Sequence, residues 1–588
     1  MSNLDELRHS TAHLMAAAVL KLWPKAKLTI GPTIENGFYY DFDFGKEKIS
    51  DADLAKIEAE MKKLVKSWGS FERIEVSAAE AKKTFKDNLY KLELIDELEK
   101  AGDQITFYES GKFLDLCRGG HIENPKEIKY FKLLSIAGAY WRGDEKNPML
   151  TRIHGTAFFK KDELDSYLTQ VEEAKVRDHR KINKQLKIYM LNDDLGQGLV
   201  TLLPNGAIIA QELEKWAIET EDKWGYVRVF TPHIMSEKLF KISGHVPYYL
   251  ASMFPPMRMA EKGQGETEVF YVKPMNCAGH HLVYKSESRS YRDLPLRIAE
   301  YGAVYRYEQS GELLGMMRVR GPIHQNDAHI FCTEAQAEEE FQKVMDLHKY
   351  YYDALGLSEK DYYLSFATRD PKNKKKYAGD DAIWDKAERI ALEYVKKTNL
   401  PYKVDEGGAA FYGPKIDFNI KTVTGKVFSA STNQLDFFLP RTFGLTYADR
   451  DGKEKTPVCI HRAPLGAHVR FIAFLMEHFA GNFPTWLAPV QAKVLPITEG
   501  NLAYGKEVTD KLKEKGIRAI LDDRNEPLGG KIRDAQLEKV AYMLVVGGRE
   551  EKEKTVAVRG RNGKDYGAEP LHKFIQKITT EIKEKTIN

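Results

Sequence analysis

The stretch R-I-A-E-Y-G-A-V-Y-R-Y-E, residues 297–308, is typical of a β-strand that carries charged groups at its end. Arg306 and Glu308 are two residues apart, and side chains with that spacing point to the same face of a strand. A guanidinium can hold a phosphate and a reacting carboxylate, while the glutamate can accept a hydrogen bond from an adenine amine. Arg318 follows after a loop. This stretch therefore predicts a strand and loop that bind a nucleotide.

A second cationic position lies much later in the chain, in H-R-A-P-L-G-A-H-V-R-F, residues 461–471. Arg470 opens an apolar helix that we expect at 471–479. Guanidiniums on two sides of a triphosphate favour adenylate transfer, because the charge that develops on the phosphoryl oxygens must be neutralised. The sequence has no G-x-x-x-x-G-K-[ST] loop, which excludes a P-loop enzyme.

Three further residues form a candidate metal site. Cys277 lies in K-P-M-N-C-A-G-H, His329 in Q-N-D-A-H-I-F, and His461 at the start of the stretch above. One thiolate and two imidazoles with an unfilled fourth position are expected of zinc that must still bind a substrate. The bare triplet is a weak signal, because motif matches carry a high false-positive risk. The segments around it carry the argument.

The composition indicates an ordinary soluble chain of several domains. It has 588 residues, 43% hydrophobic and 30% charged, with a net charge of +3, so a nucleic-acid partner needs a local basic surface. The apolar run at 14–20 is too short to span a membrane, and Asp5, Glu6 and Arg8 before it argue against a secretory signal. Four cysteines argue against a disulfide framework and for a reducing, cytoplasmic location.

Hydrophobic periodicity and proline-rich breaks divide the chain. A helix is expected at 11–23, with His9 and His13 at its start, and one long charged helix at 161–186. The stretch F-P-T-W-L-A-P-V-Q at 483–491 marks an exit into a small α/β domain with a mostly parallel sheet. The predicted parts are an N-terminal domain (1–155), a linker helix (156–186), a large mixed domain (187–489) and a C-terminal domain (490–588).

These segments together resemble the class II aminoacyl-tRNA synthetases. Residues 297–318 resemble the second signature motif of that class, and G-A-H-V-R-F resembles the start of the third. W-G-Y-V-R-V-F-T-P, residues 224–232, resembles the first, which lies at the dimer interface in that class. Within the class, four segments are similar to the threonyl-tRNA synthetase family: K-P-M-N-C-A-G-H, N-D-A-H-I-F, A-F-Y-G-P-K-I-D-F and N-Q-L-D-F. The similarity runs from Arg8 nearly to the C-terminus.

The resemblance implies a multidomain α+β and α/β fold: an α+β editing domain, a catalytic domain on an antiparallel sheet, and a C-terminal α/β anticodon-binding domain. It implies ATP-dependent ligation of threonine to tRNA(Thr) through a threonyl-adenylate, with Mg²⁺ accompanying ATP, in a homodimer. It assigns Cys277, His329 and His461 to one zinc ion (Zn²⁺) per subunit, which binds the amino and hydroxyl groups of threonine. Valine lacks the hydroxyl, and a site built to engage a hydroxyl rejects such an analogue strongly.

The resemblance also assigns the remaining residues of this site. Catalytic roles fall to Arg306, Arg470 and Lys415, and roles in binding substrate or ATP to Glu308, Arg318, Gln325, Asp327, Tyr412, Thr432 and Gln434. A structural ion pair is the alternative for each arginine, most of all Arg318. Three departures from the family concern the nucleotide side: a loop at 321–327 that is one residue longer, Ser429 in place of a common glutamine, and Ala467 in place of serine.

A second site is predicted near the N-terminus. His9, His13, Cys117 and His121 form a complete tetrahedral ligand set by composition. The resemblance instead implies a metal-free pocket that hydrolyses seryl-tRNA(Thr), lined also by Tyr40, Lys91 and Asp115. Serine differs from threonine by one methyl group, worth only about 1–3 kcal/mol of discrimination, so a second sieve is needed. A structural zinc and a set of buried histidines remain alternatives.

The C-terminal stretch D-D-R-N-E-P-L-G-G-K-I-R-D-A, residues 522–535, resembles an anticodon-binding domain. The positions that match anticodon contacts are Asn525, Lys539, Glu550 and Arg559, with ordinary solvated surface as the alternative for each. We expect the chain to lack the ubiquitin-like domain that usually begins this family, whether by gene or by trimming. A prolyl or seryl synthetase fits the Cys/His/His set less well. A retired relative that only binds tRNA would have lost Arg306, Arg470 or a zinc ligand.

Overall fold

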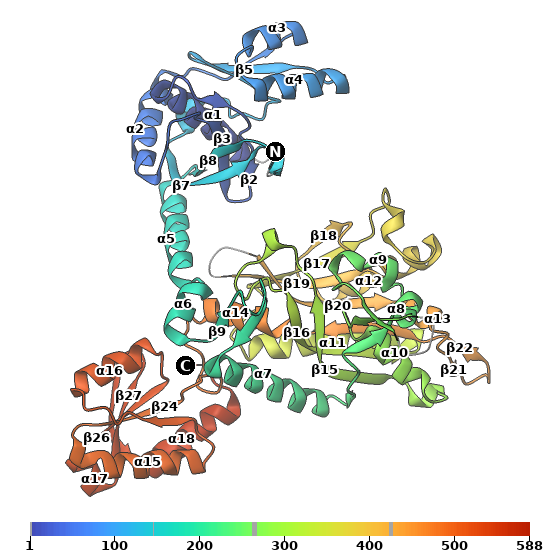
Figure 1. The fold of residues 1–588 in the computed structure, drawn as a ribbon, viewed down its shortest axis with the longest axis vertical. Helices are drawn as coiled ribbons and strands as arrows, with labels where there is room; N and C mark the ends of the chain where they lie inside the picture. Colours follow the sequence, from blue (N-terminus) through green and yellow to red (C-terminus); the bar gives the residue numbers. More distant parts are fainter. Residues whose placement is uncertain (1–2, 145, 261–266, 423–426, 588) are drawn as a thin grey trace. The chain divides into compact units, whose positions relative to one another are not determined.

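The computed structural model describes residues 3–144, 146–260, 267–422 and 427–587, which form two compact units, Met1–Glu172 and Glu173–Asn588 (Figure 1). In the described part of the chain, no helix is long and apolar enough to cross a membrane.

The N-terminal unit is built on a helix that packs against an antiparallel sheet. The sheet contains β1 (Lys27–Leu28), β3 (Gly37–Asp43), β8 (Met149–Phe158) and β7 (Tyr130–Tyr140) in that order, with β2 (Thr33–Ile34) beside β3. Helix α1 (Asn3–Leu22) begins eight residues earlier than the predicted helix, so His9 and His13 lie well inside it. Most of α1 is buried between this sheet and α2 (Leu54–Leu64), because its alanines and leucines leave little polar surface.

A smaller layer completes this unit. Its strands are β4 (Glu72–Glu75), β5 (Thr106–Ser110) and β6 (Phe113–Leu116), and its helices are α3 (Ala78–Thr84) and α4 (Leu89–Ala101). Strand β6 leads directly to Cys117, and α4 carries Lys91, so this layer supplies part of the second site.

The predicted charged helix at 161–186 is wrong as a single element. The chain forms α5 (Lys161–Arg177) and α6 (His179–Leu186), separated by Asp178 with ψ 122°. The Asp178 carboxylate accepts a hydrogen bond from the backbone N–H of Arg180 at 2.8 Å and so caps α6. Helix α5 buries only Leu164, whereas α6 buries His179, Ile182 and Leu186.

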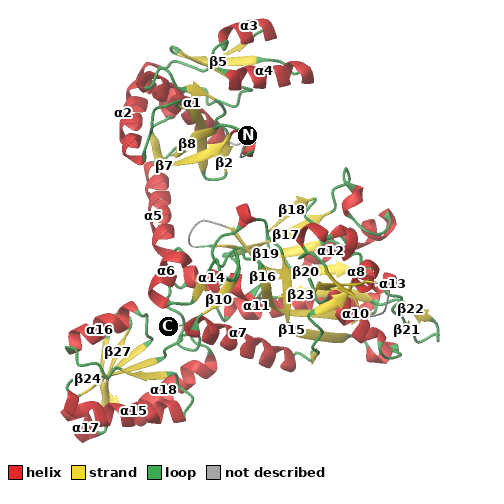
Figure 2. Cartoon of the chain, in the orientation of Figure 1, coloured by secondary structure: helices red, strands yellow, loops and turns green. Residues whose placement is uncertain are grey.

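Within the described residues, the large domain has an eight-stranded sheet (Figure 2). The order is β11 (Val227–Arg228), β15 (Leu296–Arg306), β16 (Gly321–Cys332), β23 (Val458–Ala463), β20 (Val427–Asp436), β19 (Lys415–Lys421), β17 (Tyr362–Thr368) and β18 (Tyr402–Glu406). Only the two outermost pairs are parallel, which confirms the antiparallel catalytic sheet.

One face of this sheet packs on helices and the other carries polar side chains. The helices of the domain are α7 (Pro204–Lys223), α8 (Glu237–Ile242), α9 (His245–Tyr248), α10 (Cys277–Lys285), α11 (Ala337–Asp353), α12 (Asp381–Lys397), α13 (Leu439–Thr442) and α14 (His468–His478). Ala328 and Ile330 of β16 enter the core with Phe341 of α11 and Ile472 of α14. Their neighbours Asp327 and His329 must therefore point to the opposite face.

Short strands complete the domain: β9 (Tyr189–Leu191), β10 (Val200–Leu202), β12 (Ile234–Ser236), β13 (Met257–Ala260), β14 (Thr267–Val272), β21 (Tyr447–Ala448) and β22 (Glu454–Lys455).

The C-terminal sheet is mixed, and the prediction of a mostly parallel sheet is only half right. Its order is β25 (Ala519–Leu521), β24 (Ala492–Pro496), β26 (Tyr542–Val546), β27 (Thr555–Gly560) and β28 (Asp565–Pro570). The first two pairings are parallel and the last two antiparallel. The helices are α15 (Leu502–Glu514), α16 (Leu528–Leu537), α17 (Gly548–Glu553) and α18 (Leu571–Glu584). The hairpin β27–β28 explains one of the two antiparallel pairings, since adjacent strands joined by a short turn must be antiparallel; β26 and β27 are joined through α17 instead.

Candidate active site

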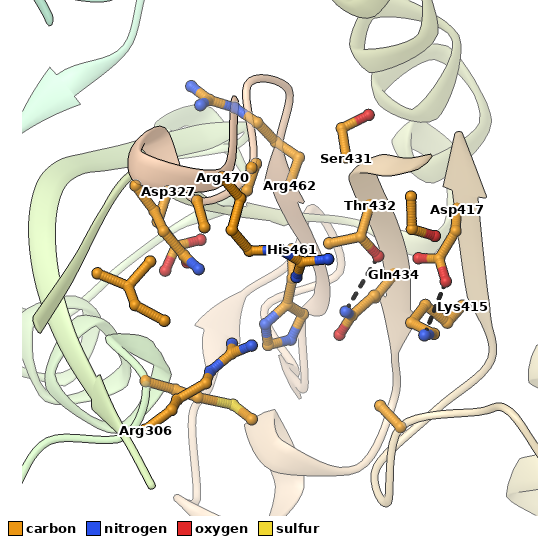
Figure 3. Close-up of a pocket in the computed structure, with 18 of the residues that line it drawn as sticks. Arg306, Asp327, Lys415, Asp417, Ser431, Thr432, Gln434, His461, Arg462 and Arg470 are labelled. Atoms are coloured by element: carbon orange, nitrogen blue, oxygen red, sulfur yellow. Dashed lines mark hydrogen bonds and ion pairs between the residues drawn. The ribbon is translucent and has the colours of Figure 1, made fainter. Parts of the chain in front are cut away.

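A cavity of about 350 Å³ opens over the polar face of the eight-stranded sheet (Figure 3). The predicted residues that line it are Cys277, Arg306, Glu308, Arg318, Gln325, Asp327, Tyr412, Lys415, Thr432, Gln434, His461 and Arg470. His329 is fully buried behind His461, with 4.4 Å between their ring centres. Residues that are far apart in sequence thus meet at one site.

A row of four predicted side chains crosses this face. His329 on β16 is paired with His461 on β23, and His461 with Gln434 on β20. Gln434 is in turn paired with Lys415 on β19. Because directly opposite residues on neighbouring strands share a face, the sheet register alone aligns these four side chains.

The three proposed metal ligands are buried together. One donor atom from each of Cys277, His329 and His461 lies within 4.8 Å of the others, and the Cys277 Sγ is 3.6 Å from His461 Nδ1. The Nε2 of His461 contacts a carboxylate oxygen of Asp436 at 3.0 Å, which leaves Nδ1 for the centre of the cluster. The Nε2 of His329 is buried with no hydrogen-bond partner among the described residues. Its lone pair is available to a metal ion.

Burial sets the protonation of these ligands when no ion is bound. It raises the pKa of Cys277 well above the ordinary value and, with the nearby His461, lowers the pKa of His329 well below it. Neutral imidazole is the form that binds metals, whereas the thiol must lose its proton to the ion.

The two central arginines approach the cavity from different elements. Arg306 ends β15, and Arg470 is on the first turn of α14. Both Nε atoms are buried without a hydrogen-bond partner in the described part of the chain. Burial, and then the charges of Arg306 and Arg318, lower the pKa of Arg470. Positive groups held together in this way form an anion site.

Glu308 and Arg318 differ in detail from the prediction. Strand β15 ends at Arg306, so Glu308 lies just past the strand, although both side chains still line the cavity. Arg318 Nε is 3.2 Å from a Glu308 oxygen and its Nη2 is 3.5 Å from Glu312. The ion-pair alternative for Arg318 therefore describes its position in this structure.

The sequence interpretation missed several lining residues, including Tyr249, Met275, Asp417, Ser431 and Arg462. Asp417 is the one that a simple signal identifies: it is two residues after Lys415 on β19, and their side chains form an ion pair at 2.7 Å. The others come from loops or from strand positions whose direction the sequence does not fix.

The structure shows the surroundings of the three positions that depart from the family. Ser429 donates to Asn419 Oδ1 at 2.7 Å. Ala467 precedes α14 and provides no side-chain cap, where a serine hydroxyl would provide one. The expected loop at 321–327 is wrong: these residues form the first half of strand β16, which pairs with β15 in continuous register from Leu296 and Phe331 to Arg306 and Gly321.

The second site gathers all seven residues that were predicted for it. The donors of His9, His13, Cys117 and His121 lie within 4.8 Å of one another. Cys117 Sγ is 3.0 Å from His9 Nε2 and 3.4 Å from His121 Nε2. Burial lowers the pKa of His121 to about 2 and raises the pKa of Cys117 to about 11, so both groups are neutral near pH 7.

A buried polar group lies beside this cluster. Lys91 Nζ is 2.5 Å from an Asp115 oxygen and 3.3 Å from the hydroxyl of Tyr40. Tyr40 also donates to the other Asp115 oxygen. All three side chains are almost fully buried, which requires the ion pair and hydrogen bonds that they make.

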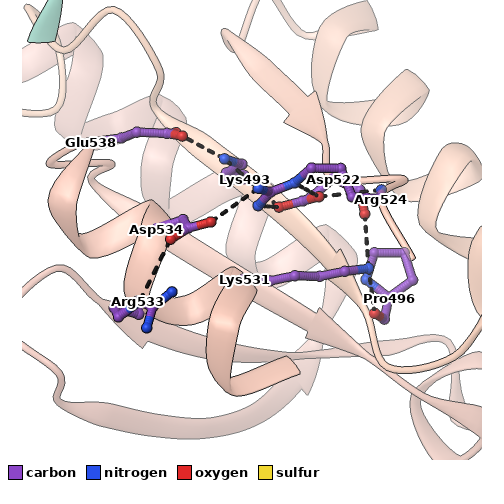
Figure 4. A network of polar contacts seen from close by, with 8 residues as sticks. All are labelled: Lys493, Pro496, Asp522, Arg524, Lys531, Arg533, Asp534 and Glu538. Carbon is purple, nitrogen blue, oxygen red and sulfur yellow. Dashed lines mark hydrogen bonds and ion pairs between the residues drawn. The ribbon is translucent and has the colours of Figure 1, made fainter. Parts of the chain in front are cut away.

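The signature stretch of the C-terminal domain is held by its own charged side chains (Figure 4). Arg524 contacts Asp522 at 2.6 Å and Asp534 at 2.9 Å. Lys531 Nζ donates to the carbonyls of Pro496 and Asp522, both at 3.2 Å. These contacts join the stretch to β24 and present the loop that contains Asn525.

The other three predicted anticodon residues lie outside the stretch 522–535. Lys539 follows α16 with φ 57° and borders two cavities. The Glu550 carboxylate accepts from Gly547 N at 3.0 Å, and Arg559 Nη2 is 2.8 Å from Asp565. Glu550 and Arg559 therefore already have intramolecular partners.

Comparison with known proteins places these observations in a family. Three family models match: "tRNA synthetase class II core domain (G, H, P, S and T)" at 260–479, "Anticodon binding domain" at 491–581, and "Threonyl and Alanyl tRNA synthetase second additional domain" at 105–154. The chain is 48% identical to the threonine–tRNA ligase of Thermotoga neapolitana, over 99% of this chain and 88% of that protein. Identity and coverage are the same with the ligase of Geobacillus kaustophilus.

Two solved structures of threonyl-tRNA synthetases are also similar to this chain. The RNA binding domain of threonyl-tRNA synthetase from Cryptosporidium parvum Iowa II is 34% identical, with a TM-score of 0.63 over 68% of this chain and 98% of that one. A putative threonyl-tRNA synthetase from Aeropyrum pernix is 27% identical, with a TM-score of 0.60 over 69% and 97%.

Proposed function

The chain belongs to the threonyl-tRNA synthetase family, the threonine–tRNA ligases, and from that membership we propose which of its residues perform each step. It is a class II aminoacyl-tRNA synthetase that joins threonine to tRNA with ATP and carries an editing domain. The assignments of metal, residues, domain limits and assembly below are proposals that rest on the geometry.

Zinc is proposed to bind Cys277, His329 and His461. The observation that carries this proposal is the buried, unpartnered Nε2 of His329, in a cluster where one donor atom from each of the three residues lies within 4.8 Å of the others. When bound, the ion supplies a Lewis acid that takes the amino and hydroxyl groups of threonine in its open coordination position. We propose that Asp327, two residues before His329 on the same face of β16, accepts a hydrogen bond from the substrate hydroxyl.

ATP is proposed to bind between Arg306 and Arg470, together with Mg²⁺. The unpartnered Nε atoms of the two arginines support this, because a buried donor without a hydrogen-bond partner is unfavourable and a phosphate oxygen would supply the missing acceptor. Lys415, from the opposite side of the cavity, adds a positive charge. Glu308 and Arg318 are proposed to separate and bind the nucleotide, since their exposed ion pair is weak. The remaining pocket residues, Gln325, Tyr412, Thr432 and Gln434, would orient threonine and the adenylate.

The second site is proposed to hydrolyse seryl-tRNA(Thr) without a metal. Neutral His9 and His121 can each accept a hydrogen bond from the attacking water or donate one to the leaving oxygen. Lys91, held by Asp115 and Tyr40, provides a fixed cation for the tRNA end or the oxyanion that develops. The alternative structural zinc would use His9, His13, Cys117 and His121 as ligands.

A homodimer is proposed to form on the segment that includes β11. Phe230 is 84% exposed, and Val227 and Ile234 are each 50% exposed. Large apolar side chains exposed on one short segment favour a contact with another protein. We further propose a cytoplasmic location, supported by four free cysteines, and tRNA contacts through Asn525, Lys539, Glu550 and Arg559.

Threonine-dependent pyrophosphate exchange, measured with and without a chelator, tests this proposal. We expect exchange in the untreated protein, loss of exchange after chelation, and recovery with added zinc. Exchange that persists in metal-free protein would contradict the proposed metal site.

A further inference from the structure

A chain of buried hydrogen bonds leads away from the proposed metal site. Nδ1 of His329 is 2.7 Å from Nδ1 of His280, and Nε2 of His280 is 3.0 Å from a Glu300 oxygen. Lys273 Nζ is 2.8 Å from the other Glu300 oxygen. The Thr231 hydroxyl donates to Glu300 at 2.8 Å and accepts from Lys273 at 2.8 Å.

These residues are buried as a unit. His280, His329 and Lys273 are 0% exposed, and Glu300 is 3% exposed. A buried lysine and glutamate are costly unless each is paired, and here each has its partner. Although burial alone raises the pKa of Glu300, the hydrogen bonds from His280, Lys273 and Thr231 hold it at about 2. Glu300 is therefore an anion, which can only accept hydrogen bonds.

The geometry gives an ordered series of hydrogen bonds. Glu300 accepts from the Nε2–H of His280 at 3.0 Å. The Nδ1 of His280, at 2.7 Å from His329, then accepts from the Nδ1–H of His329. A neutral His329 with its proton on Nδ1 has its lone pair on Nε2. This is the buried nitrogen that has no partner in the described residues.

We propose that His280 and Glu300 are positioning residues, which hold His329 in the one tautomer and ring orientation that can bind zinc. This inference rests on the proposed metal site, and extends it to residues that touch neither metal nor substrate. His461 has a comparable but shorter arrangement, because Asp436 bonds directly to its Nε2. The two histidines are thus both oriented by a carboxylate, one directly and one through a second imidazole.

Thr231 is at the end of this hydrogen-bond chain that is farthest from His329. Thr231 and its neighbour Phe230 belong to the segment proposed as the subunit interface, so the hydrogen-bond chain connects that segment to the metal ligand. The backbone N–H of Thr231 also donates to Glu300, at 3.2 Å.

The experiment measures the zinc affinity of the intact protein by competition with a chelator, so enzymatic activity is not the readout. His280→Leu removes both the acceptor and the donor, and we expect it to weaken zinc binding about 10- to 100-fold, the usual cost of losing a partner of a metal-ligating histidine. His280→Gln retains an amide oxygen and an N–H group at similar positions, so we expect it to restore much of the affinity.

His348→Leu is the matched control. His348 is equally buried and its Nδ1 also bonds to a backbone carbonyl, that of Val344 at 2.7 Å, but it lies on α11, which carries none of the three proposed ligands. We expect this variant to keep zinc close to the wild-type affinity. If His280→Leu does not fold, His280→Gln and Glu300→Gln still test the proposal. Glu300→Gln removes the anion that accepts from His280, so we expect it to weaken zinc binding more than His280→Gln does.

The outcomes separate the two proposals. Wild-type protein without stoichiometric zinc would overturn the metal site itself. Wild-type protein that holds zinc, together with a His280→Leu or Glu300→Gln variant that binds zinc no more weakly than His348→Leu does, would overturn only the positioning role of His280 and Glu300.

Discussion

Arg306 and Arg470 bring two guanidiniums to the nucleotide side of the cavity, each with a buried Nε that has no hydrogen-bond partner in the described chain. Arg306→Ala and Arg470→Ala should each slow threonyl-adenylate formation by about 10²- to 10³-fold, because each removes preorganised charge from the transition state. Arg318→Ala should have a smaller effect, since Arg318 is exposed and paired with Glu308 and Glu312. Pyrophosphate exchange measures all three, and near wild-type exchange in either of the first two variants would refute their role.

His9 and Cys117 come from different segments and meet at 3.0 Å in the second site. The double variant His9→Ala/Cys117→Ala should leave threonylation intact and let seryl-tRNA(Thr) accumulate, and Lys91→Ala should act in the same direction. Deacylation of purified seryl-tRNA(Thr) is the measurement.

Chelation is the control for that experiment, because it should stop threonine activation and spare deacylation. Loss of deacylation on chelation would favour the zinc alternative for His9, His13, Cys117 and His121. Wild-type protein that does not deacylate seryl-tRNA(Thr) would remove the editing assignment altogether.

Individual residues were predictable where a strand or a local motif fixes their direction. Gln325, Asp327 and His329 alternate on β16, so any strand interpretation places them on one face. His280 was not predicted, although it lies three residues after Cys277, because its role depends on Glu300 and Lys273 in other segments. Hydrogen bonds between distant segments leave no periodic signal in the sequence.

At the scale of elements, helix α6 contacts the hairpin that contains Arg318. His179, the first residue of α6, bonds through Nδ1 to Glu477 of α14 at 2.8 Å, and its Nε2 accepts from the backbone N–H of Met316 at 3.3 Å. Met316 lies at the tip of a tight hairpin closed by backbone bonds between Leu314 and Arg318. Both ring nitrogens of His179 therefore have hydrogen-bond partners. His179 connects α6 to α14 and to the hairpin that contains Arg318, and it does not act as a metal ligand.

His179→Ala should raise the KM for ATP about three- to tenfold, the equivalent of one lost hydrogen bond of about 1 kcal/mol, and leave the KM for threonine unchanged. Lys181→Ala, an exposed change on the same helix, is the control. This role of His179 is ruled out if the KM for ATP is unaffected, or if the KM values for ATP and threonine rise equally.

The break between α5 and α6 shows why the linker was mispredicted. Periodicity at 161–186 continues through Asp178, and aspartate inside a charged helix carries no strong stop signal. The chain bends there because His179 is fixed by Glu477 and Met316, contacts that the local sequence does not contain. By contrast, the family resemblance correctly implied an antiparallel catalytic sheet, although the number and order of its strands were not predicted.

At the scale of the molecule, the exposed Phe230 is the most direct indication of assembly. Phe230→Glu should convert a dimer to monomers, because a buried unpaired carboxylate at an apolar contact is unfavourable. Val404→Glu, at an apolar position on β18 that is 62% exposed, should leave the assembly unchanged. Sedimentation velocity distinguishes the two, and a wild-type monomer or a dimeric Phe230→Glu would contradict the proposed interface.

The most direct measurement of how the molecule selects threonine uses cobalt(II) in place of zinc. Cobalt bound by Cys277, His329 and His461 has an absorption spectrum that reports its coordination. We expect threonine to change that spectrum and valine to leave it unchanged, because only threonine brings a hydroxyl to the open position. A spectrum that does not respond to threonine, or that responds equally to valine, would contradict the claim that the metal at these three residues reads the substrate.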